Sequence, residues 1–500
     1  MKLQNRLRLL LIAGLTLSLC AFSFPSSANT PQSVIQKNKT TSERIARIEN
    51  GLLPALAIKG KPAKKFSLIE RLRFHKVPGV SVAVINNYAI EWAKGYGVKD
   101  VETNEPVTVD TMFQAASISK PVATIGMLRL VQAGQLNLDE DVNVKLKSWK
   151  VPDTSFVKEK SVTLRELVSH SAGLTVHGFR GYAATETVPT LVQLLNGEKP
   201  ANSARIINDI EPQKIWRYSG GGFCVMQLLM TDTTGKAFPQ IMQEKVLSRI
   251  GMTNSTYRQP LPVERAKQAA TGHRASGQIV KGKWHTYPEM AAAGLWTTPM
   301  DLAKLAIEVQ KAKLGKSARL LSQAMTEQML TRQFQNWGLG FNLEGKDNKA
   351  TFGHGGANEG FRCQLTAFVN GGQGAVVMTN SDTGGALAQE IIRAIAAEYG
   401  WAQSFIIERE VASVDAKVYQ TYVGEYTTPL GKLSVTVEGD SLLVELQGQG
   451  KIEIYPESEV KYFTPEVANL SLVFNKDENG KTISITIRQG AQEIPAKRLP

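Results

Sequence analysis

The chain has 500 residues, of which 42% are hydrophobic and 21% charged, and its net charge is +13. This length is too great for one ordinary hydrophobic core, so we expect at least two domains, and the composition excludes a disordered chain. The positive charge is compatible with binding to anionic surfaces, but dispersed charge that keeps the protein soluble explains it more simply. We find no basic helix interleaved with aromatic residues, so nucleic-acid binding has no support.

The N-terminus has the pattern of a secretory signal peptide. Three basic residues among the first eight precede an apolar run over residues 9–22, and small residues follow as far as Ala28. The run is short for a membrane span. Cys20 would suit a lipoprotein, but Leu19 before it is bulky. We therefore predict cleavage of residues 1–28 and an exported product, periplasmic or secreted, with no membrane span in the mature chain.

Apolar periodicity then predicts an α+β domain over residues 29–402. Asn86 and Asn87 join two expected strands, because asparagine tolerates the positive φ of a tight hairpin turn. Strands at both ends of the domain with helices between them indicate one antiparallel sheet flanked by helices. The expected strands are 80–85, 89–95, 351–352, 364–369 and 375–379. The expected helices are 41–53, 66–74, 117–134, 163–173, 189–195, 223–229, 237–250, one from 299 onward, and 386–399.

The pattern changes near Asp415. From there to residue 500, short segments alternate apolar and polar residues and are separated by turn residues such as Asn479-Gly480. This period of two predicts a small antiparallel barrel-like domain over residues 415–500. Residues 403–414 are the expected linker.

Ser117 and Lys120 are the first candidate site residues. A helix is expected to begin at Ser117, and residues three apart share a helix face, so the hydroxyl and the amine can meet. The N–H groups and positive dipole of a helix N-terminus suit an oxyanion. A lysine held there can accept a proton from serine. Pro121 would crowd the Ser117 carbonyl in a regular helix, and broken local rules tend to mark functional sites.

Tyr218 and His354 stand beside glycines. Gly220 begins a run of three glycines after Tyr218, which could present the phenol at the floor of a cleft. Gly353, Gly355 and Gly356 surround His354, and glycine in a strand often marks the close approach of a ligand or another backbone. A tyrosine packed in a turn and a structural histidine are the alternatives.

Together these stretches resemble the serine β-lactamase and penicillin-binding-protein superfamily, in its class C-like branch of D-aminopeptidases, DD-peptidases and esterases. The resemblance covers residues 67–399, and the tail from Asp415 resembles a lipocalin-like domain found on some of these peptidases. The three matching motifs are S-x-x-K at Ser117–Lys120, Y-x-N at Tyr218–Gly220, and K-T-G in its H-x-G form at His354–Gly356.

The resemblance implies a role for each of these residues. Ser117 is the nucleophile, Lys120 its base, and Tyr218 the group that carries a proton to the leaving group. His354 stands where the family's lysine assists the tyrosine and binds substrate. No cofactor and no metal is implied. The N–H groups of Ser117 and Ala357 would form the oxyanion hole, and the substrate-binding positions would include Gly355, Gly356 and Gly220.

One departure from the family pattern affects the expected substrate. Gly220 replaces the asparagine that contacts the substrate amide in β-lactamases and DD-peptidases, and His354 replaces lysine. We therefore predict a serine hydrolase that forms an acyl-enzyme at Ser117 and cleaves an ester or amide, as an esterase or a D-amino-acid or cell-wall peptide hydrolase. The alternative is a weak β-lactamase or a non-hydrolytic penicillin-binding sensor. The sequence leaves the substrate, the oligomeric state and the role of the C-terminal domain open.

Two other patterns in the sequence point to different chemistry, and neither is complete. Residues 169–173 resemble the nucleophile elbow of an α/β-hydrolase, but the first glycine is missing and a helix precedes them. His170 and His177 have no metal-ligand spacing with other candidates, so a metal site is not expected. Cys224 and Cys363 are the cysteines left after signal removal, and the sequence does not decide whether they pair.

Overall fold

The computed structural model describes residues 31–157, 160–402, 405–429, 431–447, 450–467, 470–489 and 492–500, so the predicted signal peptide lies outside it. The chain divides into two units, Met1–Glu43 and Arg44–Pro500, and the sheet, the site and the barrel all belong to the second. Helix α1 (Pro31–Glu49) begins earlier than the expected start at residue 41. No helix in the described ranges is both long and apolar enough to cross a membrane.

A seven-stranded sheet forms the centre of the second unit, and every strand pairs antiparallel to its neighbours. The first and last parts of the domain meet where β2 pairs with β10, as predicted from strands at both ends. The strands in spatial order are β4 (Glu105–Pro106), β3 (Ala89–Asp100), β2 (Gly79–Asn86), β10 (Gly374–Thr379), β9 (Phe361–Phe368), β8 (Thr351–Asn358) and β7 (Asn342–Glu344).

Two local features of the sheet differ from the sequence expectation. The β2–β3 hairpin turns at Asn87 and Tyr88, one residue later than the predicted Asn86–Asn87, because Asn86 still pairs with Ala89; the two turn residues have φ values of 51° and 60°. Strand β8 extends six residues beyond the expected end at Phe352, because its glycines stay paired with β9.

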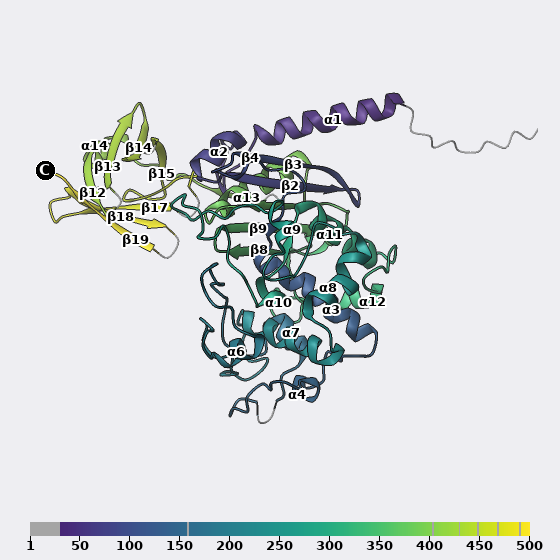
Figure 1. Cartoon of the computed structure of the whole chain (residues 1–500). Helices are drawn as coiled ribbons and strands as arrows, with labels where there is room; N and C mark the ends of the chain where they lie inside the picture. The colour runs from purple at the N-terminus through teal and green to yellow at the C-terminus, as the bar shows by residue number, and fades with distance from the viewer. Residues whose placement is uncertain are drawn as a thin grey trace, which may run out of the picture. The chain divides into compact units, whose positions relative to one another are not determined.

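Helices cover both faces of the sheet, and α3, α7 and α10 gather in a separate helical lobe (Figure 1). Shorter strands lie outside the main sheet: β1 (Leu56–Ile58) pairs with β11 (Ile407–Arg409), and β5 (Phe113–Gln114) pairs with β6 (Trp296–Thr297). The helices after α1 are α2 (Leu68–Phe74), α3 (Ser119–Gln132), α4 (Val142–Lys145), α5 (Leu164–Ser169), α6 (Leu191–Asn196), α7 (Gly220–Thr234), α8 (Phe238–Met242), α9 (Val263–Ala266), α10 (Met290–Ala293), α11 (Pro299–Lys313), α12 (Gln323–Met329) and α13 (Gly384–Glu398).

Helix α5 ends earlier than the sequence predicts. Its capping box forms as expected, with Thr163 and Glu166 bonded reciprocally. The expected end at Gly173 is wrong, because the helix stops at Ser169 and His170 adopts the left-handed conformation with a φ of 61°. A left-handed residue commonly ends a helix, and histidine adopts this conformation more often than most residues with a Cβ.

The sheet separates two hydrophobic cores. On β2, Val80, Val82 and Val84 join the core under α2 and α13, while Ala83 and Ile85 join the larger core of the helical lobe. This alternation is the period-two pattern of a strand buried on both faces. Burial on both faces therefore fixes the position of the central strands in the domain.

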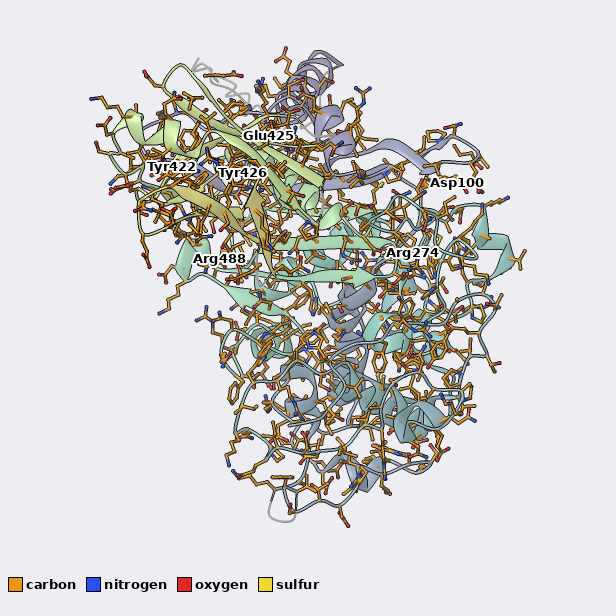
Figure 2. The ribbon with its side chains drawn as sticks, turned by 90° about the vertical axis from the view of Figure 1, so that its left-hand side faces the viewer. Asp100, Arg274, Tyr422, Glu425, Tyr426 and Arg488 are labelled. Atoms are coloured by element: carbon orange, nitrogen blue, oxygen red, sulfur yellow. The ribbon has the colours of Figure 1, made fainter. Side chains whose placement is uncertain are left out.

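The C-terminal part forms a closed eight-stranded barrel, which confirms the expected antiparallel domain. Aromatic side chains fill its interior: Tyr422 from α14 (Tyr419–Tyr422) stacks on Phe474 with ring centroids 4.0 Å apart, and Tyr426 is fully buried (Figure 2). The strands in order are β12 (Gly424–Thr428), β13 (Gly431–Glu438), β14 (Ser441–Leu446), β15 (Ile452–Pro456), β16 (Lys461–Phe463), β17 (Leu470–Lys476), β18 (Thr482–Gln489) and β19 (Gln492–Arg498).

Candidate active site

Ser117 lies on a single 3₁₀ turn, Ala116–Ile118, rather than at the start of the α-helix as predicted. Helix α3 begins two residues later, at Ser119, so Pro121 falls in its first turn. There the missing N–H of proline leaves no hydrogen bond unmade. The expected crowding by Pro121 is therefore relieved by the 3₁₀ turn, and Pro121 breaks no local rule.

The turn that carries Ser117 is held by buried contacts on both sides. Ala115 donates its N–H to the Leu295 carbonyl at 2.8 Å, and the Ser119 hydroxyl accepts the N–H of Leu295 at 2.9 Å. The Tyr257 hydroxyl donates to the Ser119 carbonyl at 2.7 Å. Neighbouring backbone therefore fixes the position of the candidate nucleophile.

Lys120 connects Ser117 to the opposite wall of the site. Its side chain is buried, and Nζ donates to Ser117 Oγ at 3.1 Å and to the Ala292 carbonyl at 2.9 Å. The same nitrogen lies 4.9 Å from the centre of the Tyr218 ring. The structure thus brings together Ser117, Lys120 and Tyr218, as their spacing and motifs predict.

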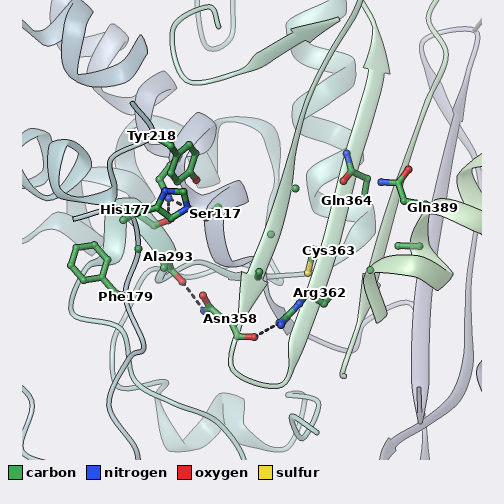
Figure 3. A pocket seen from close by; sticks show the side chains of 18 residues that line it. Ser117, His177, Phe179, Tyr218, Ala293, Asn358, Arg362, Cys363, Gln364 and Gln389 are labelled. Atoms are coloured by element: carbon green, nitrogen blue, oxygen red, sulfur yellow. Dashed lines mark hydrogen bonds between the residues drawn. The ribbon is translucent and has the colours of Figure 1, made fainter. Parts of the chain in front are cut away.

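Strand β8 forms another wall, and its glycines allow it to approach the turn (Figure 3). A Cβ on Gly356 would lie 2.3 Å from the Ala115 carbonyl oxygen, so no other residue fits without moving backbone. Strand β7 pairs with β8 only as far as Gly353, and Gly355, Gly356 and Ala357 line the pocket beyond that point.

His354 lies behind this wall and is not among the residues that line the pocket. Its ring is buried, with its centre 6.1 Å from that of Tyr218 and 5.3 Å from that of Trp337. Nδ1 is 2.5 Å from the Gly355 carbonyl, and Nε2 has no partner among the described residues. Burial, together with the positive charge of Lys120, lowers the pKa of His354 to about 3.

Gly220 begins helix α7 where the family has asparagine. A Cβ on Gly220 would lie 2.9 Å from the Phe179 ring and 3.2 Å from the His177 carbonyl oxygen. Phe179 therefore occupies the space that a longer side chain at this position would need, and Phe179, not Gly220, faces the pocket. Glycine at position 220 therefore leaves room for the Phe179 ring, which a larger residue there would displace.

The pocket over Ser117 has a volume of about 480 Å³. Lys120 and Arg362 lie in its wall, and the eighteen lining residues include no aspartate or glutamate. Arg362 Nη1 contacts Asp382 at 2.9 Å and donates to the Asn358 carbonyl at 2.7 Å. The wall therefore suits neutral or anionic groups better than ammonium groups.

Sequence reasoning missed several residues of the site. His170, to which the sequence assigned no role in this site, stacks on Tyr218 with ring centroids 4.2 Å apart. Trp337 and Phe179 have no local motif that could have identified them. Asn358 Nδ2 donates to Gln114 Oε1 at 2.8 Å and to the Ala293 carbonyl at 3.1 Å, which joins β8 to β5 and α10.

Cys224 and Cys363 are both buried and unpaired, which answers the question of their pairing that the sequence left open. Cys363 Sγ instead donates to the Gln114 carbonyl at 3.2 Å. Over the described ranges, no group of three or more His, Cys, Asp or Glu side chains could hold a metal ion.

Comparison with known proteins assigns the family. A family model described as Beta-lactamase matches residues 67–399. The chain is 20% identical to Penicillin-binding protein 4* of Bacillus subtilis (strain 168) over 417 residues, which cover 80% of this chain and 90% of the relative. It is 24% identical to Penicillin-binding protein 4 of Amycolatopsis lactamdurans over 349 residues, or 65% of this chain and 86% of the relative.

A solved structure shares the fold. The octameric penicillin-binding protein homologue from Pyrococcus abyssi aligns with a TM-score of 0.56 at 20% identity, covering 86% of this chain and 98% of that one. The matched family region contains the whole candidate site, from the turn at Ser117 to the glycines of β8. The chain therefore belongs to the beta-lactamase family, within the superfamily of serine β-lactamases and penicillin-binding proteins, a family of serine hydrolases.

Proposed function

We propose that this protein is an exported serine hydrolase that cleaves an ester or an amide through an acyl-enzyme on Ser117. The observation that carries the proposal is the 3.1 Å hydrogen bond between Lys120 Nζ and Ser117 Oγ at the wall of an open pocket. Lysine next to a serine hydroxyl, with a tyrosine beside both, is an arrangement suited to activating the serine. Export is inferred from the sequence of residues 1–28.

The proposed chemistry conserves protons. In the reacting state Lys120 has released a proton to solvent, so its amine accepts the Ser117 proton while Oγ bonds to the carbonyl carbon, and the N–H groups of Ser117 and Ala357 stabilise the oxyanion. Tyr218 then protonates the leaving group as its bond to the carbonyl carbon breaks. The phenolate of Tyr218 recovers a proton from the Lys120 ammonium. Water hydrolyses the acyl-enzyme by the same groups in reverse.

The pocket wall favours some substrates over others. An aminopeptidase has to bind a free ammonium group, and no carboxylate lines this pocket. Phe179 fills the space beside Gly220 where the family's asparagine would bind a substrate amide. Both features favour esters and N-blocked or carboxylate-bearing peptides over amino-terminal substrates and over efficient β-lactam hydrolysis.

A fluorophosphonate probe tests the nucleophile directly. We expect the unaltered protein to be labelled, Ser117→Ala to lose labelling, and Lys120→Ala to lower kcat/KM by about 10⁴-fold for any ester it cleaves. Labelling that survives Ser117→Ala would refute the proposed nucleophile. Because Lys120 is buried, thermal unfolding of each variant should accompany the kinetics to show that it is folded.

A substrate panel with one shared acyl group then separates the candidate activities. It compares a nitrophenyl ester, an alkyl ester, an N-acetyl-D-amino-acid amide and a chromogenic cephalosporin. Ester or amide turnover that exceeds cephalosporin turnover supports the proposal. The second candidate, a penicillin-binding sensor, is favoured by the glycine at position 220, and labelling by a penicillin without turnover of any substrate would establish it instead.

A further inference from the structure

We propose that His170 is a positioning residue for the hydrolytic reaction, holding the Tyr218 phenol where it protonates the leaving group. The proposal rests on the proposed function, because it concerns how Tyr218 performs its step. It assigns a role to a histidine that the sequence alone leaves without one. His170 touches no reacting atom, and its effect is exerted through Tyr218.

The ring of Tyr218 is positioned by ring contacts. Among the described residues, no hydrogen bond to the Tyr218 hydroxyl is seen that would orient it. The nearest ring is that of His170, with centroids 4.2 Å apart and planes 28° apart. His177 follows at 4.8 Å and Trp337 at 5.9 Å. His177 is exposed, whereas His170 is buried, so His170 is the rigid support among them.

His170 also holds the backbone on both sides of Tyr218. Its carbonyl accepts the N–H of Arg217 at 2.9 Å, and its Nδ1 accepts the N–H of Ser219 at 3.1 Å. One residue thus contacts the ring of Tyr218 and bonds to both of its chain neighbours. His170 holds these contacts from the C-terminal end of α5, with a left-handed φ of 61° that histidine adopts more often than most residues with a Cβ.

The ring of His170 is neutral in this arrangement. Because Nδ1 accepts a hydrogen bond, the proton of the neutral ring is on Nε2, which is buried without a partner among the described residues. The ring stands perpendicular to Trp337 at 4.8 Å. Burial first, and then the charge of Lys120, lowers the pKa of His170 far below its usual value. His170 therefore adds no positive charge beside Lys120.

Loss of the His170 contacts should affect the second half of acylation, in which the leaving group is expelled. Tyr218 gives its proton to the leaving oxygen or nitrogen as the bond to the carbonyl carbon breaks, so a misplaced phenol slows expulsion of a basic leaving group. A nitrophenolate leaves without being protonated and depends little on Tyr218. A displacement of about 1 Å can cost about 10²-fold in such a step.

Three substitutions separate the two contacts of His170. His170→Asn keeps a side-chain oxygen that can accept the Ser219 N–H and tolerates positive φ, but it lacks the ring. His170→Phe keeps a ring but no acceptor. His170→Ala keeps neither. The reporter is kcat/KM for ethyl acetate and nitrophenyl acetate, which share an acyl group and differ in leaving group.

For His170→Asn we expect a loss of about 10²-fold with ethyl acetate and less than about 10-fold with nitrophenyl acetate. In a Tyr218→Phe background the same substitution should cost less than about 3-fold, because the group that His170 positions is gone. Equal losses with the two esters, or a full additional loss in the Tyr218→Phe background, would overturn the proposal. Thermal unfolding of each variant shows that the protein remains folded.

A crystal structure of His170→Asn keeps the test independent of turnover. We expect the Tyr218 ring to shift by about 1 Å or more from its place beside Lys120, and a shift below about 0.5 Å would overturn the proposal. If the unaltered protein cleaves neither ester and is not labelled by a fluorophosphonate, the proposed function fails. The position of Tyr218 in the variant still decides the role of His170.

Discussion

A buried ionisable cluster on one side of the seven-stranded sheet is fully hydrogen-bonded, whereas three buried ionisable residues near the candidate site have side-chain atoms that are unpaired in the described part of the chain. Under α2 and α13, Glu390 accepts from Arg71 through both carboxylate oxygens, at 2.8 and 2.5 Å, and His75 Nε2 lies 3.0 Å from the same carboxylate. On the side of the helical lobe, Nε2 of His170, Nε2 of His354 on β8 and both carboxylate oxygens of Glu289 are buried with no partner among the described residues.

This difference distinguishes buried polar groups that stabilise the fold from buried polar groups near the candidate site. Buried polar groups are normally hydrogen-bonded, so each exception calls for an explanation. None of Arg71, His75 and Glu390 lines the pocket, and this paired cluster requires no explanation. Two of the unpaired groups, His170 and His354, surround Tyr218. The third, Glu289, precedes helix α10, whose Ala292 carbonyl accepts from Lys120.

The largest expected change in stability comes from breaking the paired cluster. Glu390→Ala would leave Arg71, whose side chain is 4% exposed, without its counter-charge. We expect the free energy of unfolding to fall by about 4 kcal/mol, because an uncompensated buried charge remains. Denaturant unfolding measures it.

The matched control for that change is Glu390→Gln, which keeps an oxygen acceptor for Arg71 and should lose less stability. Activity per folded molecule should stay unchanged in both variants, since the cluster does not reach the pocket. A loss below about 1 kcal/mol in Glu390→Ala would show that the cluster is not the stabilising unit described here.

Glu289, which has no buried partner among the described residues, should destabilise the folded chain when it ionises. Burial raises its pKa to about 8. Between about pH 4.5 and pH 8 the folded chain therefore holds a proton that the unfolded chain has released, and this group's contribution to stability falls as the pH rises. We expect Glu289 to remove about 3 kcal/mol of stability between pH 4 and pH 7, and Glu289→Gln to abolish that loss.

The measurement for Glu289 is the change in unfolding free energy between the two pH values, so any fixed cost of the glutamine cancels. Gln227 holds the backbone beside Glu289, donating to the Pro288 carbonyl at 3.1 Å and accepting the Ala291 N–H at 2.8 Å, and it should keep α10 in place in the variant. An unchanged pH dependence would mean that Glu289 is ionised or solvated in the folded chain.

The sequence predicted the features of the fold and the site that depend on a local pattern. Ser117 and Lys120 meet because a three-residue spacing places them on one side of a helical turn, and the alternation of the β2 valines predicts a strand. The capping box at Thr163 was equally readable, since both of its members lie within one turn.

The rest depends on contacts between distant segments. His170 lies 48 positions before Tyr218, and no local pattern indicates that their rings stack. Nor does a local pattern indicate that α5 ends at Ser169 and not at Gly173. Gly220 could be read as a departure from the family motif, but only the structure shows that Phe179 occupies the vacated space.

The smallest expected effect is on the pH dependence of stability and comes from His354. Its pKa of about 3 in the folded chain lies below the ordinary value of 6.5 because the ring is buried beside Lys120. Between those values the unfolded chain binds a proton that the folded chain does not, so stability falls as the pH falls. We expect His354→Gln to lose about 2 kcal/mol less than the unaltered protein between pH 7 and pH 5.

His177→Gln provides the control for His354→Gln, because His177 lies near Tyr218 yet is exposed. It should leave the acid sensitivity unchanged, so the difference between the two variants isolates burial from proximity to the site. If His354→Gln and His177→Gln respond alike to acid, the buried ring behind β8 is hydrated or charged in the folded protein. The Nε2 atom of His354 would then have a hydrogen-bond partner in solution, as the buried groups of the Arg71–His75–Glu390 cluster do.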